Sequence, residues 1–147
     1  MHFGILAHSA EGAALCFRTF CLEGEARLGE HMHPDVTLDC IAMGRSMKGW
    51  ESGDYAAVRA VHAASAERLA RAGADFFACP DNTSHIALET PGPALALPGL
   101  NIAEVVADEA LRRGMTKVGA LGTRFSMDGP ADRRALTGRR VGVAVPD

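Results

Sequence analysis

One stretch of the chain combines an apolar strand, a polar turn and the start of a helix: Asp75-Phe76-Phe77-Ala78-Cys79-Pro80-Asp81-Asn82-Thr83-Ser84-His85. Residues 76–79 form an uninterrupted apolar run, which is typical of a strand buried on both faces. Pro80 ends that strand because its nitrogen carries no hydrogen. Residues 83–89 are predicted to form a short helix. A strand that runs through a polar turn into a helix is a building unit of α/β proteins.

The sequence on both sides of this stretch repeats the same alternation. Apolar runs predict strands, and amphipathic segments bounded by capping residues and glycines predict helices. The remaining predicted strands are Phe3–Ala7, Val36–Leu38 together with Ile41–Met43, Lys117–Leu121 and Val141–Val145; the remaining predicted helices are Gly12–Gly29, a helix capped by Ser52 and ended by Gly73, Ile102–Arg113 and Ala131–Thr137. Short links between them imply an α/β fold with a parallel sheet flanked by helices.

Composition excludes several classes of partner. The 147 residues suit one domain, the net charge is −3, and basic residues cluster only in pairs such as Arg112-Arg113, which argues against nucleic acid. No apolar run reaches the roughly 18 residues of a membrane helix. His8-Ser9-Ala10-Glu11 interrupts the first apolar run, so no signal peptide is expected. A cytoplasmic protein without a membrane partner is therefore predicted.

Cysteine and histidine usage gives no metal or redox motif. The four cysteines form no C-x-x-C pair, and structural buried thiols are predicted for Cys16, Cys21 and Cys40. His31 and His33 lack a third ligand, so no metal site is predicted. His62, among polar and small residues of a helix, is predicted to lie on the surface.

In a parallel sheet, ligands bind at the carboxyl ends of the strands near a topological switch point. This rule selects the turns Ala7–Gly12, Met43–Ser52, Pro80–His85 and Gly122–Met127. The first of them lacks the glycines of a G-x-G-x-x-G loop, so a dinucleotide site is not expected.

The turn after residue 80 has the side chains of an anion-binding site. Asn82, Thr83 and Ser84 offer donors at a helix start, where a carboxylate or phosphate is favoured. Thr123 and Ser126, in the matching later turn, offer hydroxyls to the same anion. The same residue types are also ordinary helix caps, and both interpretations stay open. His85 is a candidate substrate donor, with a capping or packing role as the alternative.

Three segments together resemble a known family. They are the N-terminal Gly4-Ile5-Leu6, the strand Gly73-Ala74-Asp75-Phe76-Phe77 that runs into Asn82-Thr83-Ser84-His85, and the block Gly114-Met115-Thr116-Lys117-Val118-Gly119-Ala120-Leu121-Gly122-Thr123-Arg124-Phe125-Ser126-Met127. The order and spacing resemble the aspartate/glutamate (Asp/Glu/hydantoin) racemase superfamily. The resemblance implies two α/β lobes related by pseudo-twofold symmetry, with the active site between them. Residues 1–114 are then the first lobe and residues 115–147 the start of the second.

The resemblance also implies a reaction. Members work without pyridoxal phosphate or metal, so no cofactor is expected. Two acid/base residues, usually cysteines, stand on opposite faces of the α-carbon of a small amino acid or carboxylic acid, because inversion requires proton return from the far side. The predicted substrate contacts are Ser9, Trp50, Asn82, Thr83, His85, Thr123 and Ser126. For Trp50, packing is the alternative. A homodimer is one candidate assembly.

Two departures from the family pattern matter. Asp81 stands where the first catalytic cysteine is expected, and Cys79 lies two residues earlier. We assign the base role to Asp81 before Cys79, and expect burial and a substrate carboxylate to raise the pKa of Asp81. A pure helix-cap role for Asp81 is the alternative.

The second departure is that the chain ends at Asp147, before the Gly-Cys-Thr-type turn of the second catalytic cysteine. We interpret the chain as a fragment; the alternatives are a missing part supplied from elsewhere, or a chain that is no competent racemase. The predicted function is a cofactor-independent racemase or epimerase of an aspartate- or glutamate-like amino acid. A non-catalytic carboxylate-binding or partner-assembling module, and a one-cysteine decarboxylase of a malonate-type acid, are the alternatives.

Overall fold

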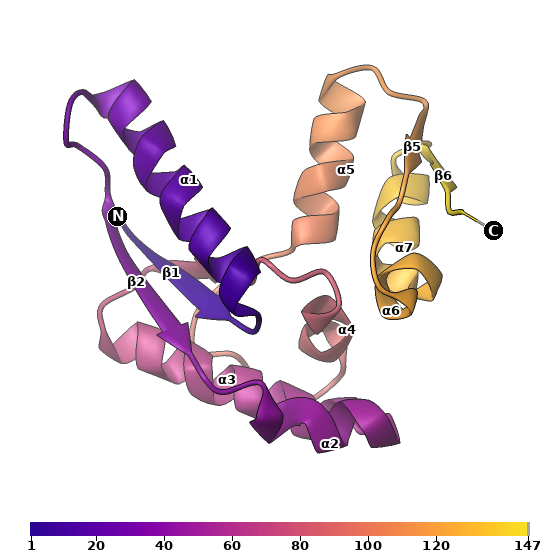
Figure 1. Cartoon of the computed structure of the whole chain (residues 1–147), viewed down its shortest axis with the longest axis horizontal. Helices are drawn as coiled ribbons and strands as arrows, with labels where there is room; N and C mark the ends of the chain where they lie inside the picture. The colour runs from indigo at the N-terminus through magenta and orange to yellow at the C-terminus, as the bar shows by residue number, and fades with distance from the viewer. Residues whose placement is uncertain (147) are drawn as a thin grey trace.

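The computed structural model describes residues 1–146 and contains two parallel sheets with helices packed against them (Figure 1). The strands are β1 (His2–Ala7), β2 (Asp35–Cys40), β3 (Phe76–Ala78), β4 (Gly99–Leu100), β5 (Lys117–Gly119) and β6 (Gly142–Ala144). The helices are α1 (Ala10–Leu28), α2 (Gly44–Ser52), α3 (Tyr55–Arg71), α4 (Ser84–Glu89), α5 (Ile102–Arg112), α6 (Arg124–Asp128) and α7 (Pro130–Gly138). The predicted α/β class with parallel strands flanked by helices is confirmed.

The first sheet has the strand order β2-β1-β3-β4. Alternate residues of its central strand β1 face two different helices. Phe3 and Ile5 pack with Ala13 of α1, whereas Leu6 packs with Leu69 of α3. Because both faces of β1 are covered, the strand is apolar almost throughout rather than alternating. Figure 1 shows α1 and α3 on opposite sides of this sheet.

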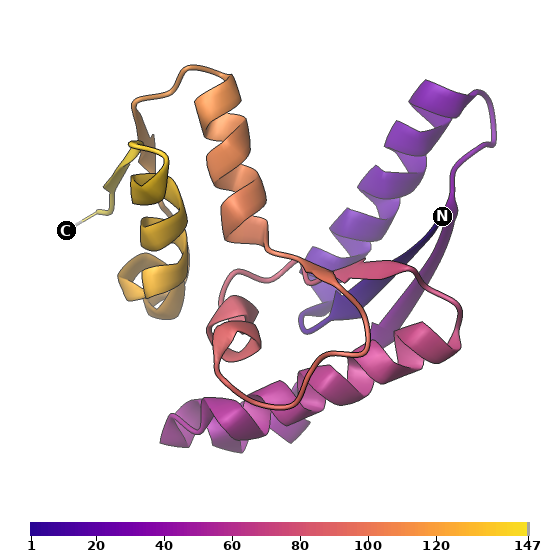
Figure 2. The ribbon, with the colours of Figure 1, turned by 180° about the vertical axis from the view of Figure 1, so that it is seen from behind.

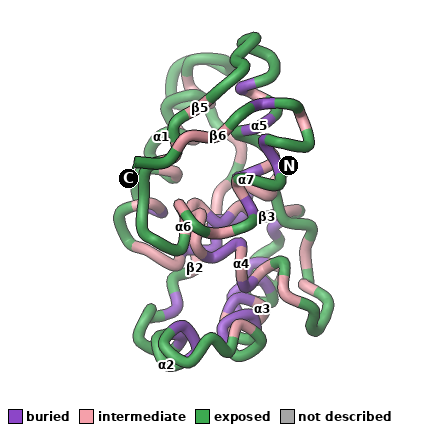
Figure 3. Tube along the Cα trace, turned by 90° about the vertical axis from the view of Figure 1, so that its right-hand side faces the viewer, coloured by how far each residue is buried: buried purple, intermediate pink, exposed green. Residues whose placement is uncertain are grey.

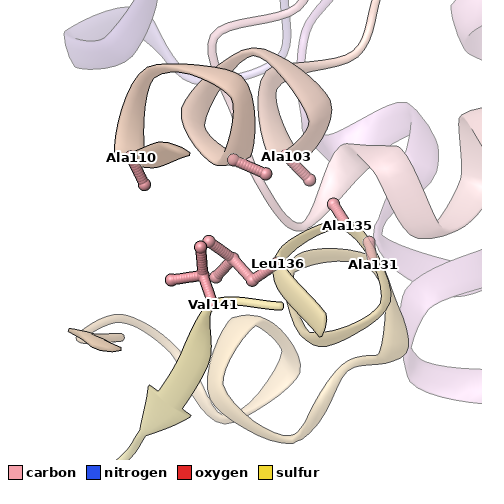
Figure 4. Close-up of a cluster of buried hydrophobic side chains, with 7 residues drawn as sticks. Ala103, Ala110, Ala131, Ala135, Leu136 and Val141 are labelled. Atoms are coloured by element: carbon pink, nitrogen blue, oxygen red, sulfur yellow. The ribbon is translucent and has the colours of Figure 1, made fainter. Parts of the chain in front are cut away.

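The second sheet consists of β5 and β6, and its cover comes from α5 and α7. Small side chains let the two helices approach closely: Ala103 and Ala110 of α5 face Ala131 and Ala135 of α7 (Figure 4). Leu136 and Val141 complete this cluster. Helix α5 lies before residue 114 in the sequence but packs with the second sheet. The division of the chain at residues 114 and 115 stays a prediction, and this packing favours a boundary ahead of α5.

Helix α4 lies between the two parts of the molecule in both ribbon views (Figures 1 and 2). It contacts α3 on one side and α7 on the other. Buried residues concentrate along α3 and α4, as the tube in Figure 3 shows. The turn that precedes α4 is therefore held between the two sheets by a buried helix.

Several local predictions were wrong. The turns Met43–Ser52 and Gly122–Met127 contain the short helices α2 and α6, and β2 ends at Cys40 before Ile41–Met43. Asp54 caps α3 by accepting from the backbone N–H of Ala57 at 3.0 Å, whereas the Ser52 hydroxyl donates to the carbonyl of Lys48. Helices as short as α2, with 9 residues, and α6, with 5, show too little periodicity to be recognised from apolar spacing.

The cysteine and histidine predictions also need correction. Cys40 is exposed, Cys16 and Cys21 are half-buried, and Cys79 is fully buried. His62 is only 2% exposed, because it lies on the inner face of α3 with Val58 and Leu69. Among the helices of residues 1–146, none has both the length and the apolar character required to span a membrane.

Candidate active site

A cleft of about 760 Å³ opens at the carboxyl ends of β1, β3 and β5. All four turns selected by the switch-point rule contribute to it. Its polar lining comprises His8, Ser9, Trp50, Asp81, Asn82, Thr83, Thr123, Ser126 and Asp132. Its apolar lining includes Met43, Met47, Phe125, Leu121 and Met127. We refer to the polar lining residues together as the polar wall of the cleft.

Three hydroxyl groups meet on the polar wall although two segments supply them. The Oγ1 of Thr83 lies 3.3 Å from the Oγ1 of Thr123 and 3.2 Å from the Oγ of Ser126. Thr123 and Ser126 hydroxyls are 3.4 Å apart. Each hydroxyl can donate or accept. The Thr123 oxygen also accepts from the backbone N–H of Ser126 at 3.3 Å, and the three hydroxyls can turn their hydrogens towards a bound anion.

Asn82 lies beside these hydroxyls and is held by an acidic residue of α7. Its side-chain amide donates to both carboxylate oxygens of Asp132, at 3.2 and 3.3 Å. Asp132 lines the cleft and was not recognised from the sequence. The Asn82 amide and the Asp132 carboxylate thus form a donor and acceptor pair next to the hydroxyl cluster.

Asp81 presents its carboxylate to the cleft with both oxygens hydrogen-bonded. Its Oδ2 lies 2.8 Å from the Nδ1 of His8, and its Oδ1 accepts from the backbone N–H of Ser84 at 3.3 Å. Burial raises the pKa of Asp81, but the hydrogen bond with His8, together with the N–H groups of Ser84 and Thr83, outweighs burial and lowers this pKa below its ordinary value. The predicted rise of this pKa is wrong for the ligand-free site, because sequence reasoning missed His8.

Cys79 does not reach the cleft. It is 1% exposed and packs with Leu6 and Phe77 in the core on the α3 side of the sheet. Burial raises the pKa of its thiol to about 12. In a continuous strand, side chains two residues apart point to the same side, but β3 ends at Ala78 and so does not extend to Cys79 and Asp81. A thiolate at Cys79 is therefore strongly disfavoured.

His85 also lies away from the cleft. It is 3% exposed, and its Nε2 lies 3.2 Å from the carbonyl oxygen of Cys79 and 3.5 Å from the backbone nitrogen of Ile102. Burial lowers its pKa. These contacts tie the turn after β3 to the start of α5, so the geometry favours the packing role over substrate donation.

Ser9 and Trp50 both line the cleft. The Ser9 hydroxyl caps α1 by accepting from the N–H of Gly12 at 3.3 Å. Trp50 is 8% exposed, and its ring lies between Tyr55 and Phe125, with centroids 5.6 and 6.0 Å away. Trp50 therefore has a packing role as well as a place on the cleft wall.

Sequence reasoning missed three further polar residues of the site besides Asp132: His8, Ser46 and His62. His8 follows β1 directly, inside a turn that the switch-point rule had selected, but Ser9 was the residue of that turn predicted to contact the substrate. His62 lies at helical spacing from Val58 and Leu69, a pattern that places it on the buried face of α3. In residues 1–146, no group of three histidine, cysteine, aspartate or glutamate side chains is arranged to hold a metal ion.

The sequence matches the Asp/Glu/Hydantoin racemase family over residues 24–147. The fold is similar to a crystal structure of a Yersinia pestis protein assigned as an Asp/Glu racemase, with a TM-score of 0.88, 27% identity, and coverage of 100% of this chain and 65% of that one. An aspartate racemase homologue from Pyrococcus horikoshii OT3 gives a TM-score of 0.81 at 25% identity, with 99% and 64% covered. Picrophilus torridus aspartate racemase shares the fold at a TM-score of 0.79 and 15% identity, with 100% and 63% covered. The chain thus spans slightly less than two thirds of the length of these proteins.

Proposed function

The chain belongs to the Asp/Glu/hydantoin racemase family, and on that premise we propose that it forms the proton-abstracting side of a cofactor-independent racemase or epimerase of an amino acid. One observation carries the proposal. The carboxylate of Asp81 and the hydroxyls of Thr83, Thr123 and Ser126 line the same cleft. A base and a carboxylate-binding group in one cleft are what proton transfer at an α-carbon requires.

The hydroxyl cluster and Asn82 hold the substrate carboxylate in this proposal. Ser126 and Thr123 lie within 3.4 Å of Thr83, so one carboxylate can accept from all three hydroxyls. Binding replaces hydroxyl-to-hydroxyl contacts by charge-assisted hydrogen bonds, which are roughly twice as strong as neutral ones. The substrate carboxylate is thereby fixed with its α-carbon towards the rest of the polar wall.

Asp81 is the base in this proposal. The Cα–H bond breaks, the proton moves to a carboxylate oxygen of Asp81, and the electron pair stays on the substrate, where its carboxylate delocalises it. Because the pKa of Asp81 lies below its ordinary value, the base is ionised at neutral pH. Cys79 is not used, since it does not line the cleft.

Asp132 supports an amino acid rather than a simple acid as the substrate. Its carboxylate already accepts from Asn82 and lies on the cleft wall, where an α-ammonium group has a charged partner. Among the residues that the structure describes, none of those lining the cleft is a lysine or an arginine. A second carboxylate on the substrate therefore has no lysine or arginine partner among these lining residues. For this reason the assay must compare acidic with neutral amino acids.

Exchange of the substrate α-proton in heavy water tests the base directly. Proton NMR of aspartate, glutamate and alanine with the full chain is expected to show loss of the α-proton signal for at least one of them. Asp81→Asn is expected to slow the exchange about 10²- to 10⁴-fold, the usual contribution of a positioned base. The matched control is Asp35→Asn, at an exposed position of β2, which should leave the rate unchanged. Equal rates for the parent chain and Asp81→Asn would refute the assignment.

The second candidate function is a carboxylate-binding module without turnover. It is favoured by one observation: in residues 1–146 no thiol lines the cleft, whereas inversion needs an acid on the far face of the α-carbon. This candidate predicts binding of the amino acid by calorimetry without exchange, and loss of binding in Thr83→Val. The decarboxylase alternative predicts release of carbon dioxide from a malonate-type acid, and the burial of Cys79 disfavours it.

A further inference from the structure

His8 links the end of β1 to the proposed base, Asp81. It follows β1 directly, and its side chain is 8% exposed. Its Nδ1 lies 2.8 Å from the Oδ2 of Asp81, and its Nε2 lies 3.3 Å from the indole Nε1 of Trp50. The imidazole is therefore placed between the proposed base and the tryptophan of α2.

The chemistry of the partners determines where the His8 ring carries its proton. An indole N–H can only donate, so the Nε2 of His8 is the acceptor of the Trp50 contact. A neutral imidazole has one donor and one acceptor nitrogen. The proton therefore lies on Nδ1, which donates to the Oδ2 of Asp81. The N–H of Ser84 holds the other carboxylate oxygen, at Oδ1. Hydrogen bonds thus run in one direction, from Trp50 through His8 to an ionised Asp81.

His62 is the next aromatic neighbour of His8. The ring of His62 on α3 packs edge-on against it, with centroids 5.3 Å apart at 86°. Burial lowers the pKa of His62 to about 4, so His62 is neutral near pH 7. Beyond His62 lie Arg59 and His85. The charged group in direct contact with His8 is thus the carboxylate of Asp81.

Ser46 is a second possible hydrogen-bond partner of the Nε2 of His8. Its hydroxyl donates to the carbonyl of Met43 at 2.8 Å, so its oxygen faces the Nε2 of His8 as an acceptor at 3.2 Å. A proton on Nε2 would be received by Ser46 and would end the Trp50 hydrogen bond. Trp50 and Ser46 therefore compete for Nε2, and the indole N–H selects the form with the proton on Nδ1.

We propose that His8 is the positioning residue of the Asp81 base and that the indole N–H of Trp50 sets its tautomer. The catalytic part rests on the proposed function: His8 holds one carboxylate oxygen so that Asp81 keeps its charge and its orientation towards the α-carbon. The tautomer itself is a property of the ligand-free chain. The two parts can therefore be tested separately.

Nitrogen-15 NMR of the histidine rings of the full chain tests the tautomer without any substrate. At pH 7.5, His8 is expected to show a protonated-type Nδ1 and an unprotonated-type Nε2, the less common tautomer in solution. Trp50→Phe keeps an aromatic ring for Tyr55 and Phe125 but removes the N–H, and should shift the His8 population towards the Nε2–H form, with Ser46 as its acceptor. Tyr55→Phe is the matched control and should leave the shifts unchanged. An Nε2–H tautomer of His8 in the parent chain would overturn the proposal.

Two substitutions of His8 separate positioning from packing. Asparagine has an N–H close to the place of Nδ1, so His8→Asn retains a donor to Asp81, whereas His8→Ala removes it. Carbon-13 titration of the Asp81 carboxyl should show a higher pKa in His8→Ala than in His8→Asn. Substrate α-proton exchange should fall about 10- to 100-fold in His8→Ala, because a misplaced catalytic group loses rate on that scale, and most of it should return in His8→Asn. Equal exchange and equal pKa in both variants and the parent would refute the positioning role.

These outcomes distinguish the inference from the proposed function. If neither the parent chain nor any variant exchanges the α-proton, the proposed function fails, while the tautomer and the carboxyl titration still decide the role of His8. If the parent exchanges, Asp81→Asn does not, and His8→Ala does so at the parent rate, the positioning inference fails alone. His31→Ala, at an exposed histidine, is the control for loss of an imidazole.

Discussion

The side-chain amide of Asn82 donates to both carboxylate oxygens of Asp132, at 3.2 and 3.3 Å, although 50 residues separate them. Asn82 follows the first sheet, and Asp132 lies in α7, which packs on the second. The contact therefore joins the two parts of the molecule, and both of its residues line the cleft. It also places a carboxylate where the proposed substrate carries its ammonium group.

Asp132→Asn is expected to weaken binding of an amino acid more than binding of the matching acid without the amino group. Aspartate and succinate form such a pair. Loss of a charge-assisted hydrogen bond of about 1.5–3 kcal/mol predicts roughly a 10- to 100-fold weaker affinity for aspartate and little change for succinate. Isothermal calorimetry on the full chain measures both, with Asp128→Asn as the exposed control. An equal loss for the two ligands would mean that Asp132 acts only through Asn82.

Cys79 is expected to be chemically inert in the folded chain. Its thiol is 1% exposed and its pKa is raised to about 12 by burial, whereas Cys40 is exposed. Because the thiolate is the reactive form, iodoacetamide should label Cys40 first and Cys79 only after unfolding in urea. Peptide mass spectrometry gives the order of labelling. Cys79→Ala should leave α-proton exchange at the parent rate. A large fall in that rate would mean that the Cys79 thiol takes part in the reaction.

The stability of the fold is expected to fall as the pH drops below 6.5 because of His62. Its pKa in the folded chain is about 4, below the ordinary value of 6.5, so the unfolded chain binds a proton in a range where the folded chain does not. Stability is therefore full above pH 6.5 and is lost as the pH falls towards 4. The total amounts to roughly 3 kcal/mol, at about 1.4 kcal/mol per pKa unit.

Urea unfolding at pH 7 and pH 5 measures this dependence. His62→Gln should flatten it, because the substituted side chain does not titrate. His31→Gln, at an exposed position, should retain it. An equal loss of the free energy of unfolding between pH 7 and pH 5 in the parent and in His62→Gln would contradict this prediction.

Gly12 permits the start of α1 to approach the turn that carries Asp81. A Cβ added at this position would lie 2.5 Å from the carbonyl oxygen of Pro80 and 2.9 Å from the hydroxyl of Ser9. Gly12→Ala should therefore destabilise the chain by about 1–3 kcal/mol, as overpacking does. Gly138→Ala in α7 meets nothing within 4 Å and should be neutral, or stabilising by up to about 1 kcal/mol. The midpoint of thermal unfolding is expected to fall in Gly12→Ala and to stay unchanged or rise in Gly138→Ala, and an unchanged midpoint in Gly12→Ala would contradict the close approach at Gly12.

The amino-acid sequence alone was sufficient to predict the α/β class, the parallel strands and the turns that line the cleft. The stretch from Asp75 to His85 illustrates why. An apolar run, a proline and capping residues act locally, and their preferences for strand, break and helix start do not depend on the rest of the chain. The same local signals also identified Asp81, Asn82 and Thr83, because these residues directly follow a buried strand.

Only the tertiary structure decided which side chains meet. Cys79 and Asp81 are two residues apart in the chain, yet one lies in the core and the other in the cleft, because β3 ends at Ala78, before both of them. His8 comes from the turn after β1, Trp50 from α2 and Asp132 from α7. Their approach to Asp81 and Asn82 follows from how the sheets and helices pack. Strand and helix preferences are set by neighbours along the chain, whereas hydrogen-bond partners, burial and pKa are set by neighbours in space. The sequence by itself thus determined where the site lies, and the packing of distant elements determined its chemistry.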